Sequence, residues 1–205
     1  FMKKKFKLFA TIGSLALAVC MMTIGVLAAT QVTFNVTSNV SFTTDKVYVD
    51  VTGKVEYGAT ASRESKNFTG KNYTGTPGDT AATNMVLTAG TGLTQEDITG
   101  TTVKFGSLAF AEEKDNTIVY TFTITNKGAN VCFVKITPTN GIESADNVTA
   151  APNISGGIAA VDGSEALAKG ESVTYTYTLT ITDISKSVTP GDVSFAFVMQ
   201  SAEMN

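Results

Sequence analysis

The chain has 205 residues, of which 43% are hydrophobic, and its 15 basic and 18 acidic side chains give a net charge of −3. This balance argues against binding to nucleic acid or to anionic lipid, because both require basic patches. The sequence contains no histidine, which excludes Ser–His and Cys–His nucleophiles and histidine-containing zinc sites. No two carboxylates stand out from ordinary surface charge, so we predict neither an enzymatic activity nor a bound cofactor.

Residues 1–28 are predicted to be a secretory signal peptide. Lysines cluster between residues 3 and 7, and an uncharged, mostly apolar run over residues 8–27 follows them. Small residues come next at Ala28 and Ala29, where we expect cleavage. The apolar run is long for a signal, so an uncleaved membrane anchor is the alternative. Otherwise the chain touches the membrane only through this segment before cleavage.

Cleavage leaves one domain, residues 29–205, with a net charge of about −7 and a single cysteine, Cys132. No disulfide can form within this domain. Cys132 alternates in phase with Val134 and Ile136, so we expect it to face the core, with a reactive thiol as the alternative. A lysine-rich signal without disulfides favours a Gram-positive bacterium, in which the protein is secreted, extracellular or at the cell surface.

Residues 31–42 form the first predicted strand of the processed chain. Polar and apolar residues alternate strictly over most of this segment, which places the apolar side chains on one face. That face consists of Val32, Phe34, Val36, Val40 and Phe42. The strand is long and amphipathic, and removal of the signal exposes it.

Alternating apolar residues over residues 47–57 predict a pair of strands, with a turn or bulge at Thr52 and Gly53. Residues 85–87 are predicted to form a short strand, and residues 94–97 to cap a single helical turn.

Residues 58–84 are rich in Gly, Ser, Thr and Asn and are predicted to form a long polar surface loop. Phe68 and Tyr73 lie in two stretches of this loop that have similar sequences. Their side chains either pack onto the sandwich or form a contact surface. The second alternative is considered because long loops on rigid scaffolds often contain binding residues.

Residues 103–110 are predicted to form a strand that changes phase. Val103 and Phe105 share one phase, whereas Leu108 and Phe110 share the other. We therefore expect a kink at Gly106, where the strand could pass from one sheet to the other.

Two segments, residues 118–125 and 173–182, alternate large apolar residues with threonine. Successive side chains on a strand point to opposite faces, so both are predicted to be half-buried antiparallel strands. Residues 131–136 and 193–199 are further predicted strands, and residues 139–166 a polar connection. The predicted fold class is all-β: an antiparallel two-sheet sandwich of immunoglobulin-like or jelly-roll-like Greek-key type, preceded by a helical signal peptide.

Few segments suggest ligand chemistry. The Gly-x-Gly of residues 88–92 lacks the third glycine and the βαβ context of a phosphate loop, so it is predicted to be an ordinary loop. Acidic turns at residues 112–115 and 162–165 carry carboxylates of the kind that bind calcium in extracellular domains. Their spacing matches no known calcium loop, so we interpret them as solvated turns, with calcium as the alternative.

Two stretches resemble motifs of secreted bacterial immunoglobulin-like domains. Residues 120–128 form a threonine-rich strand that ends in Asn-Lys-Gly, and residues 167–175 begin with Leu-Ala-Lys-Gly-Glu-Ser. In size, signal and single-domain plan, the chain resembles the group of TasA and camelysin, the exported subunits of Firmicute biofilm fibres. This resemblance spans residues 108–200. It implies polymerisation by donor-strand exchange, in which the processed N-terminal strand of one subunit completes the sheet of the next.

The leading functional prediction is a secreted structural subunit of a bacterial surface or extracellular-matrix assembly such as a biofilm. Residues 31–42 would be its assembling strand, and its partners would be further copies or other surface and matrix proteins. The alternative is a cell-surface adhesin that binds a glycan or a protein through Phe68 and Tyr73. A plain exported domain of a larger complex is a third interpretation.

Overall fold

The computed structural model describes residues 35–78, 84–110, 117–140, 148–155, 165–182 and 191–203. All of them belong to the second of the two units of the chain, residues 33–205. The predicted signal peptide, its predicted cleavage site at Ala28 and Ala29, and the predicted strand residues Val32 and Phe34 lie outside the described residues, as do most residues of the two predicted acidic turns. Among the described residues, no helix is long and apolar enough to cross a membrane.

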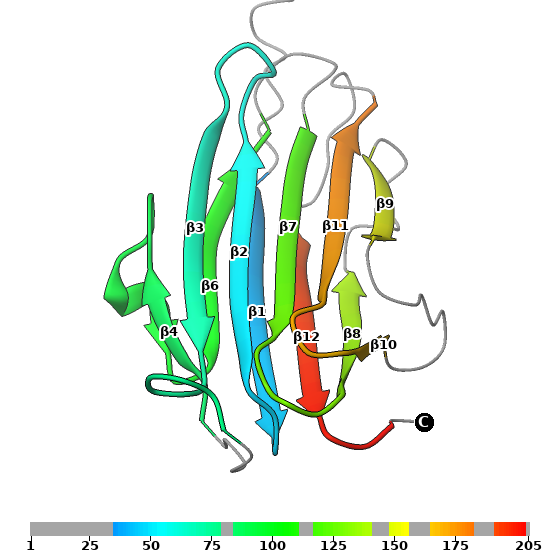
Figure 1. Cartoon of the computed structure of the whole chain (residues 1–205). Helices are drawn as coiled ribbons and strands as arrows, with labels where there is room; N and C mark the ends of the chain where they lie inside the picture. The colour runs from blue at the N-terminus through cyan, green and yellow to red at the C-terminus, as the bar shows by residue number, and fades with distance from the viewer. Residues whose placement is uncertain are drawn as a thin grey trace, which may run out of the picture. The chain divides into compact units, whose positions relative to one another are not determined.

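The described strands form two facing sheets, which confirms the prediction of an all-β sandwich (Figure 1). In spatial order, sheet A contains β10 (Glu165–Leu167), β8 (Cys132–Asn140), β12 (Gly191–Gln200), β1 (Asn35–Asp45), β6 (Thr102–Ala109) and β5 (Ile98–Thr99). Sheet B contains β4 (Val86–Ala89), β3 (Glu64–Lys71), β2 (Val49–Tyr57), β7 (Thr117–Asn126), β11 (Ser172–Ile181) and β9 (Val148–Ser155). After β6 the chain alternates between the sheets, because β7, β9 and β11 belong to one and β8, β10 and β12 to the other.

β1 and β12 pair in parallel, so the prediction of a purely antiparallel sandwich was wrong at this pair. Val36 lies opposite Gly191, and Asp45 lies opposite Gln200. On its other side β1 pairs with β6 in the antiparallel sense. A parallel pair needs a long crossover between its strands, and here that crossover is the rest of the fold. No turn residues in the sequence indicate that these two strands pair.

β7 and β11 are the two threonine-rich strands, and they pair directly in sheet B, as half-buried strands. Their outward threonines contact each other: Thr123 Oγ1 lies 3.0 Å from Thr174 Oγ1, and Thr125 Oγ1 lies 2.7 Å from Ser172 Oγ. The register continues this hydroxyl row across five strands of sheet B. The row consists of Thr88, Thr69, Thr52, Thr123 and Thr174.

The two motifs that carry the family resemblance meet at Asn126. The Asn126 side chain donates to the carbonyl of Leu167 at 2.8 Å and to that of Asn130 at 2.7 Å, while its oxygen accepts from the Gly128 amide at 2.8 Å. Its main chain bonds to Gly170 and Glu171. Asn126 is fully buried, so this set of bonds offsets the cost of burying a polar amide.

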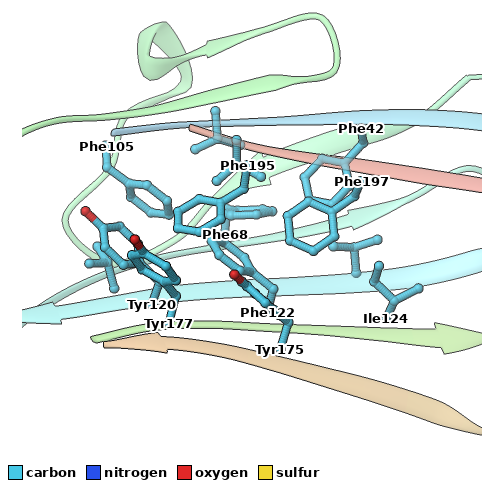
Figure 2. Close-up of a cluster of buried hydrophobic side chains, with 14 of the residues drawn as sticks. Phe42, Phe68, Phe105, Tyr120, Phe122, Ile124, Tyr175, Tyr177, Phe195 and Phe197 are labelled. Carbon is cyan, nitrogen blue, oxygen red and sulfur yellow. The ribbon is translucent and has the colours of Figure 1, made fainter. Parts of the chain in front are cut away.

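The core is a layer of side chains between the two sheets, and Figure 2 shows its aromatic centre. Phe195 and Phe197 of β12 point from sheet A toward Phe122 of β7, with ring centroids 5.1 and 5.0 Å away. Tyr120 of β7 lies 5.1 Å from Phe195 and 6.2 Å from Phe105 of β6. Such offset and edge-to-face contacts stabilise the layer beyond simple burial of area.

The prediction of one long polar loop over residues 58–84 was wrong, because β3 lies within it. Phe68 of β3 is 1% exposed and belongs to the core, so it does not form a contact surface. The predicted turn at Thr52 and Gly53 was also wrong, since β2 runs unbroken from Val49 to Tyr57. Gly53 lies directly opposite Phe68, and the Phe68 ring fills the space that a side chain at position 53 would occupy.

Other local predictions had mixed outcomes. The capped turn exists as a single 3₁₀ turn, Gln95–Asp97, in which the Thr94 amide donates to the Asp97 carboxylate at 2.7 Å. The predicted kink in β6 is a bulge, but the strand stays in sheet A. The predicted polar connection over residues 139–166 was wrong in part, because it contains β9 and the start of β10.

Replacement of Gly53 by alanine is expected to destabilise the fold. The added methyl group would overlap the buried Phe68 ring, and overpacking of this kind costs about 1–3 kcal/mol. Chemical denaturation should show this loss for Gly53→Ala. Gly78→Ala is the matched control, since no atom lies within 4 Å of a side chain at that position. Equal stability of both variants would contradict the close packing of Phe68 on Gly53.

Candidate functional site: the first strand and its groove

The candidate site is β1, which lies between β6 and β12 in sheet A (Figure 1). We call the space that β1 occupies between these two strands the groove. Three apolar side chains of β1, Val36, Val40 and Phe42, are at most 2% exposed. The inward residue between the valines is Ser38, which is also fully buried. Every second residue of β1 therefore points into the core from Val36 to Phe42.

Phe42 anchors β1 to both sheets. Its ring stacks on Phe197 of β12 at 5.1 Å and meets Phe68 of β3 edge-on at 5.8 Å (Figure 2). Its amide donates to the carbonyl of Thr101 at 3.0 Å. Phe42 therefore extends the aromatic layer from β1 to both sheets.

β1 is joined to β2 by a short crossing, Lys46–Tyr48, between the end of β1 and the start of β2. Asn72 donates to the carbonyl of Val47 at 2.7 Å and accepts from the amide of Val49 at 2.9 Å. Lys46, just before this anchor, has a φ of 55°, an uncommon value for a residue with a side chain. The exposed residue Lys46, which follows the last residue of β1, is therefore a candidate hinge.

Two other strand edges of the described fold, at β8 and β9, contain prolines that disfavour an added strand. β10 covers only residues 132–134 of β8, and the remaining part of β8 contains Pro138, which has no amide to donate. β9, at the end of sheet B, contains Pro152. Lys66 Nζ donates to the carbonyl of Phe105 at the outer side of β6. Prolines and lysines at edges are common protection against edge-to-edge pairing.

The structure separates the two aromatics of the predicted binding loop. Phe68 is buried, whereas Tyr73 is half-buried and packs edge-on against Tyr48 at 5.9 Å. The Tyr73 hydroxyl donates to Asp50 at 2.6 Å, and partial burial together with this bond raises the pKa of Tyr73 to about 12. Asp50 also borders an open hollow of about 450 Å³ over β2, β3 and β4. The adhesin interpretation therefore retains Tyr73 alone.

Cys132 is fully buried, as predicted for a core residue, and it is a free thiol. Burial raises the pKa of the Cys132 thiol to about 12, which suppresses the thiolate that a reactive cysteine requires. The described residues contain no cluster of three side chains able to hold a metal ion.

Comparison of the chain with protein-family models, with curated proteins and with solved structures finds no match. The proposed function therefore rests on β1 and its neighbouring strands in sheet A.

Sequence reasoning placed β1 correctly as an amphipathic strand but missed three features of the site. Ser38 was not recognised as inward-facing and buried, although it shares the phase of Val36 and Val40. The parallel neighbour β12 and the hinge at Lys46 left no signal, because pairing partners and backbone dihedrals depend on the complete fold.

Truncation of Phe42 to alanine is expected to cost about 3–5 kcal/mol, because it removes a buried ring that contacts both sheets. Urea denaturation should measure this loss, with Thr43→Ala, at an exposed neighbouring position, as the control. A loss below about 1 kcal/mol for Phe42→Ala would show that β1 is not packed as described.

Cys132 is expected to resist alkylation by iodoacetamide at pH 8 until the protein unfolds. The control is Val131→Cys in a Cys132→Ala background, since the Val131 side chain is 44% exposed. Peptide mass spectrometry should find rapid labelling at position 131 and slow labelling at position 132. Equal rates would restore the reactive-thiol interpretation.

Proposed function

We propose that the protein is an exported structural subunit that polymerises by exchanging β1 between copies, as part of a Gram-positive surface or extracellular-matrix assembly such as a biofilm. The sandwich would then be immunoglobulin-like and related in design to the TasA and camelysin group. The observation that carries the proposal is the place of β1, a strand that fills a central groove yet precedes every other described strand. β1 could therefore leave its place without pulling any other described strand through the fold.

Three further observations support strand exchange over edge-to-edge association. Prolines at β8 and β9 disfavour addition of a strand at those edges. The pairing of β1 with β12 is parallel, which is slightly less stable per residue than antiparallel pairing. The crossing that follows β1 has an uncommon backbone conformation at Lys46, and short strained hinges favour swapping of the segment that they hold.

The free energy of strand exchange depends on the fact that the incoming strand has the same sequence as the strand that it replaces. A β1 strand from a second copy would bury the same side chains, so assembly restores the packing that opening disrupts. Opening exposes Val36, Val40 and Phe42, each worth roughly 1.5–3 kcal/mol when fully buried. We therefore expect slow assembly that depends on protein concentration.

A reversible clamp on β1 is expected to block assembly. Thr37 and Ser107 lie opposite each other on β1 and β6, so a Thr37→Cys, Ser107→Cys pair can form a disulfide that holds β1 in its own groove. Processed parent protein at high concentration should form filaments in negative-stain micrographs. The oxidised clamp variant should stay monomeric by size-exclusion chromatography and assemble after reduction.

The control clamp joins β7 to β11 through Thr121→Cys and Thr176→Cys, a register pair in sheet B that leaves β1 free. This variant should assemble when oxidised. Filaments from the oxidised β1 clamp, or a parent protein that remains monomeric at all concentrations, would contradict the proposed function.

A further inference from the structure

We infer that the outer edge of β4 is a surface at which two copies of the chain can pair, and that the Gln95 side chain keeps this edge closed. The inference does not rest on the proposed function. It concerns one end of sheet B, whereas strand exchange concerns β1 inside sheet A.

β4 is the last described strand at one end of sheet B, and its sequence lacks the usual protection of an edge (Figure 1). Residues 86–89, Val-Leu-Thr-Ala, include no charge and no proline. β9, at the opposite end of the same sheet, contains Pro152. Val86 is 61% exposed, more than any other large apolar side chain of the described residues. An exposed, uncharged edge strand of this kind is a site where another strand can add.

The backbone of β4 directs the polar groups of two residues toward the free edge. The Gly90 amide donates to the carbonyl of Asn67 on β3 at 2.9 Å, so Gly90 and, two residues earlier, Thr88 face β3. Because successive residues direct their backbone groups to opposite sides, Leu87 and Ala89 face away from β3. Their amide and carbonyl groups are the ones that an added strand would bind.

The Gln95 side chain contacts these outward groups. Its oxygen accepts from the Ala89 amide at 3.4 Å, and its nitrogen donates to the Leu87 carbonyl at 3.4 Å. One side-chain amide therefore takes a donor and an acceptor that a partner strand would use. Both distances are long for a hydrogen bond, so the contact is weak. It covers the edge but contributes little to the stability of the fold.

A closed turn holds Gln95 beside β4. The amide and the hydroxyl of Thr94 both donate to the Asp97 carboxylate, at 2.7 and 2.9 Å. These bonds cap the single 3₁₀ turn Gln95–Asp97. The position of Gln95 therefore depends on local bonds within the turn and does not require a long, freely moving loop.

The β4 edge is complementary to the β4 edge of a second copy. Antiparallel pairing about a two-fold axis would place Leu87 of each copy opposite Ala89 of the other, so that outward donors meet outward acceptors. Thr88 would lie opposite Thr88 and would extend the hydroxyl row of sheet B into the second copy. Thr123 and Thr174 already make such a cross-strand contact at 3.0 Å. No like charges would meet, since β4 has none.

Disulfide cross-linking through position 88 tests this inference. Thr88→Cys in a Cys20→Ala, Cys132→Ala background leaves one thiol in the chain. The proposed pairing would place this thiol opposite the same thiol of a second copy, within disulfide reach. Addition of Gln95→Ala should raise the yield of disulfide-linked dimer about tenfold, because it uncovers the outward groups of β4. An unchanged yield would overturn the inference.

Three control variants separate edge pairing from unspecific contact. Glu96→Ala changes the next, exposed residue of the same turn and should leave the yield unchanged. Thr69→Cys in place of Thr88→Cys moves the thiol from the edge to β3 in the same row and should give no increase with Gln95→Ala. Gln95→Glu places a charge at the edge and should suppress pairing. Equal increases at positions 69 and 88 would contradict pairing at the edge.

The oxidised β1 clamp separates this inference from the proposed function. In Thr37→Cys, Ser107→Cys protein β1 is held in its own groove, so a dimer cannot arise by strand exchange. Gln95→Ala in this background should form a dimer in sedimentation velocity, and its melting temperature should stay near that of the clamp alone. A monomer in this background, together with filaments from unclamped parent protein, would contradict pairing through β4 and leave strand exchange standing.

Discussion

The fold depends on one layer of aromatic rings that joins the two sheets. Phe195 and Phe197 on β12 meet Phe122 on β7, with centroid separations between 5.0 and 5.1 Å. Strand pairing alone holds each sheet together but does not hold one sheet to the other. The sandwich therefore exists because these rings exclude water from both inner faces at once. Phe42 of β1 extends the layer from its place between β12 and β6.

Under the proposed strand exchange, β1 would combine two roles that are usually separate. As core, it supplies buried side chains whose removal opens the aromatic layer. As the first described strand, joined to β2 by a short crossing at Lys46, it is also the segment that can leave with the least rearrangement. The packing is the same whether β1 comes from its own chain or from another. The equilibrium between monomer and assembly would therefore depend on the hinge and on protein concentration, because exchange forms no new interactions.

Residues with a strong period-two signal were predicted well. β7 and β11 alternate large apolar residues with threonine, and both have the buried and half-exposed faces that this pattern implies. β3 was missed for a physical reason. Its inner face at Phe68 and Gly70 contains one large side chain and one glycine, since Gly70 lies against Leu87. Because neighbouring side chains fill this face, the sequence of β3 itself shows few apolar residues at alternating positions.

The sequence by itself determined which face of each strong strand points inward, because alternation along a strand is a local property of the backbone. It also determined the chemistry on the outer face of β7 and β11, where most outward positions hold threonine. Only the tertiary structure decided which strands are neighbours, and hence that β1 lies parallel to β12. The physical reason is that pairing partners are chosen by packing across the whole core, and period two specifies a face but not a neighbour.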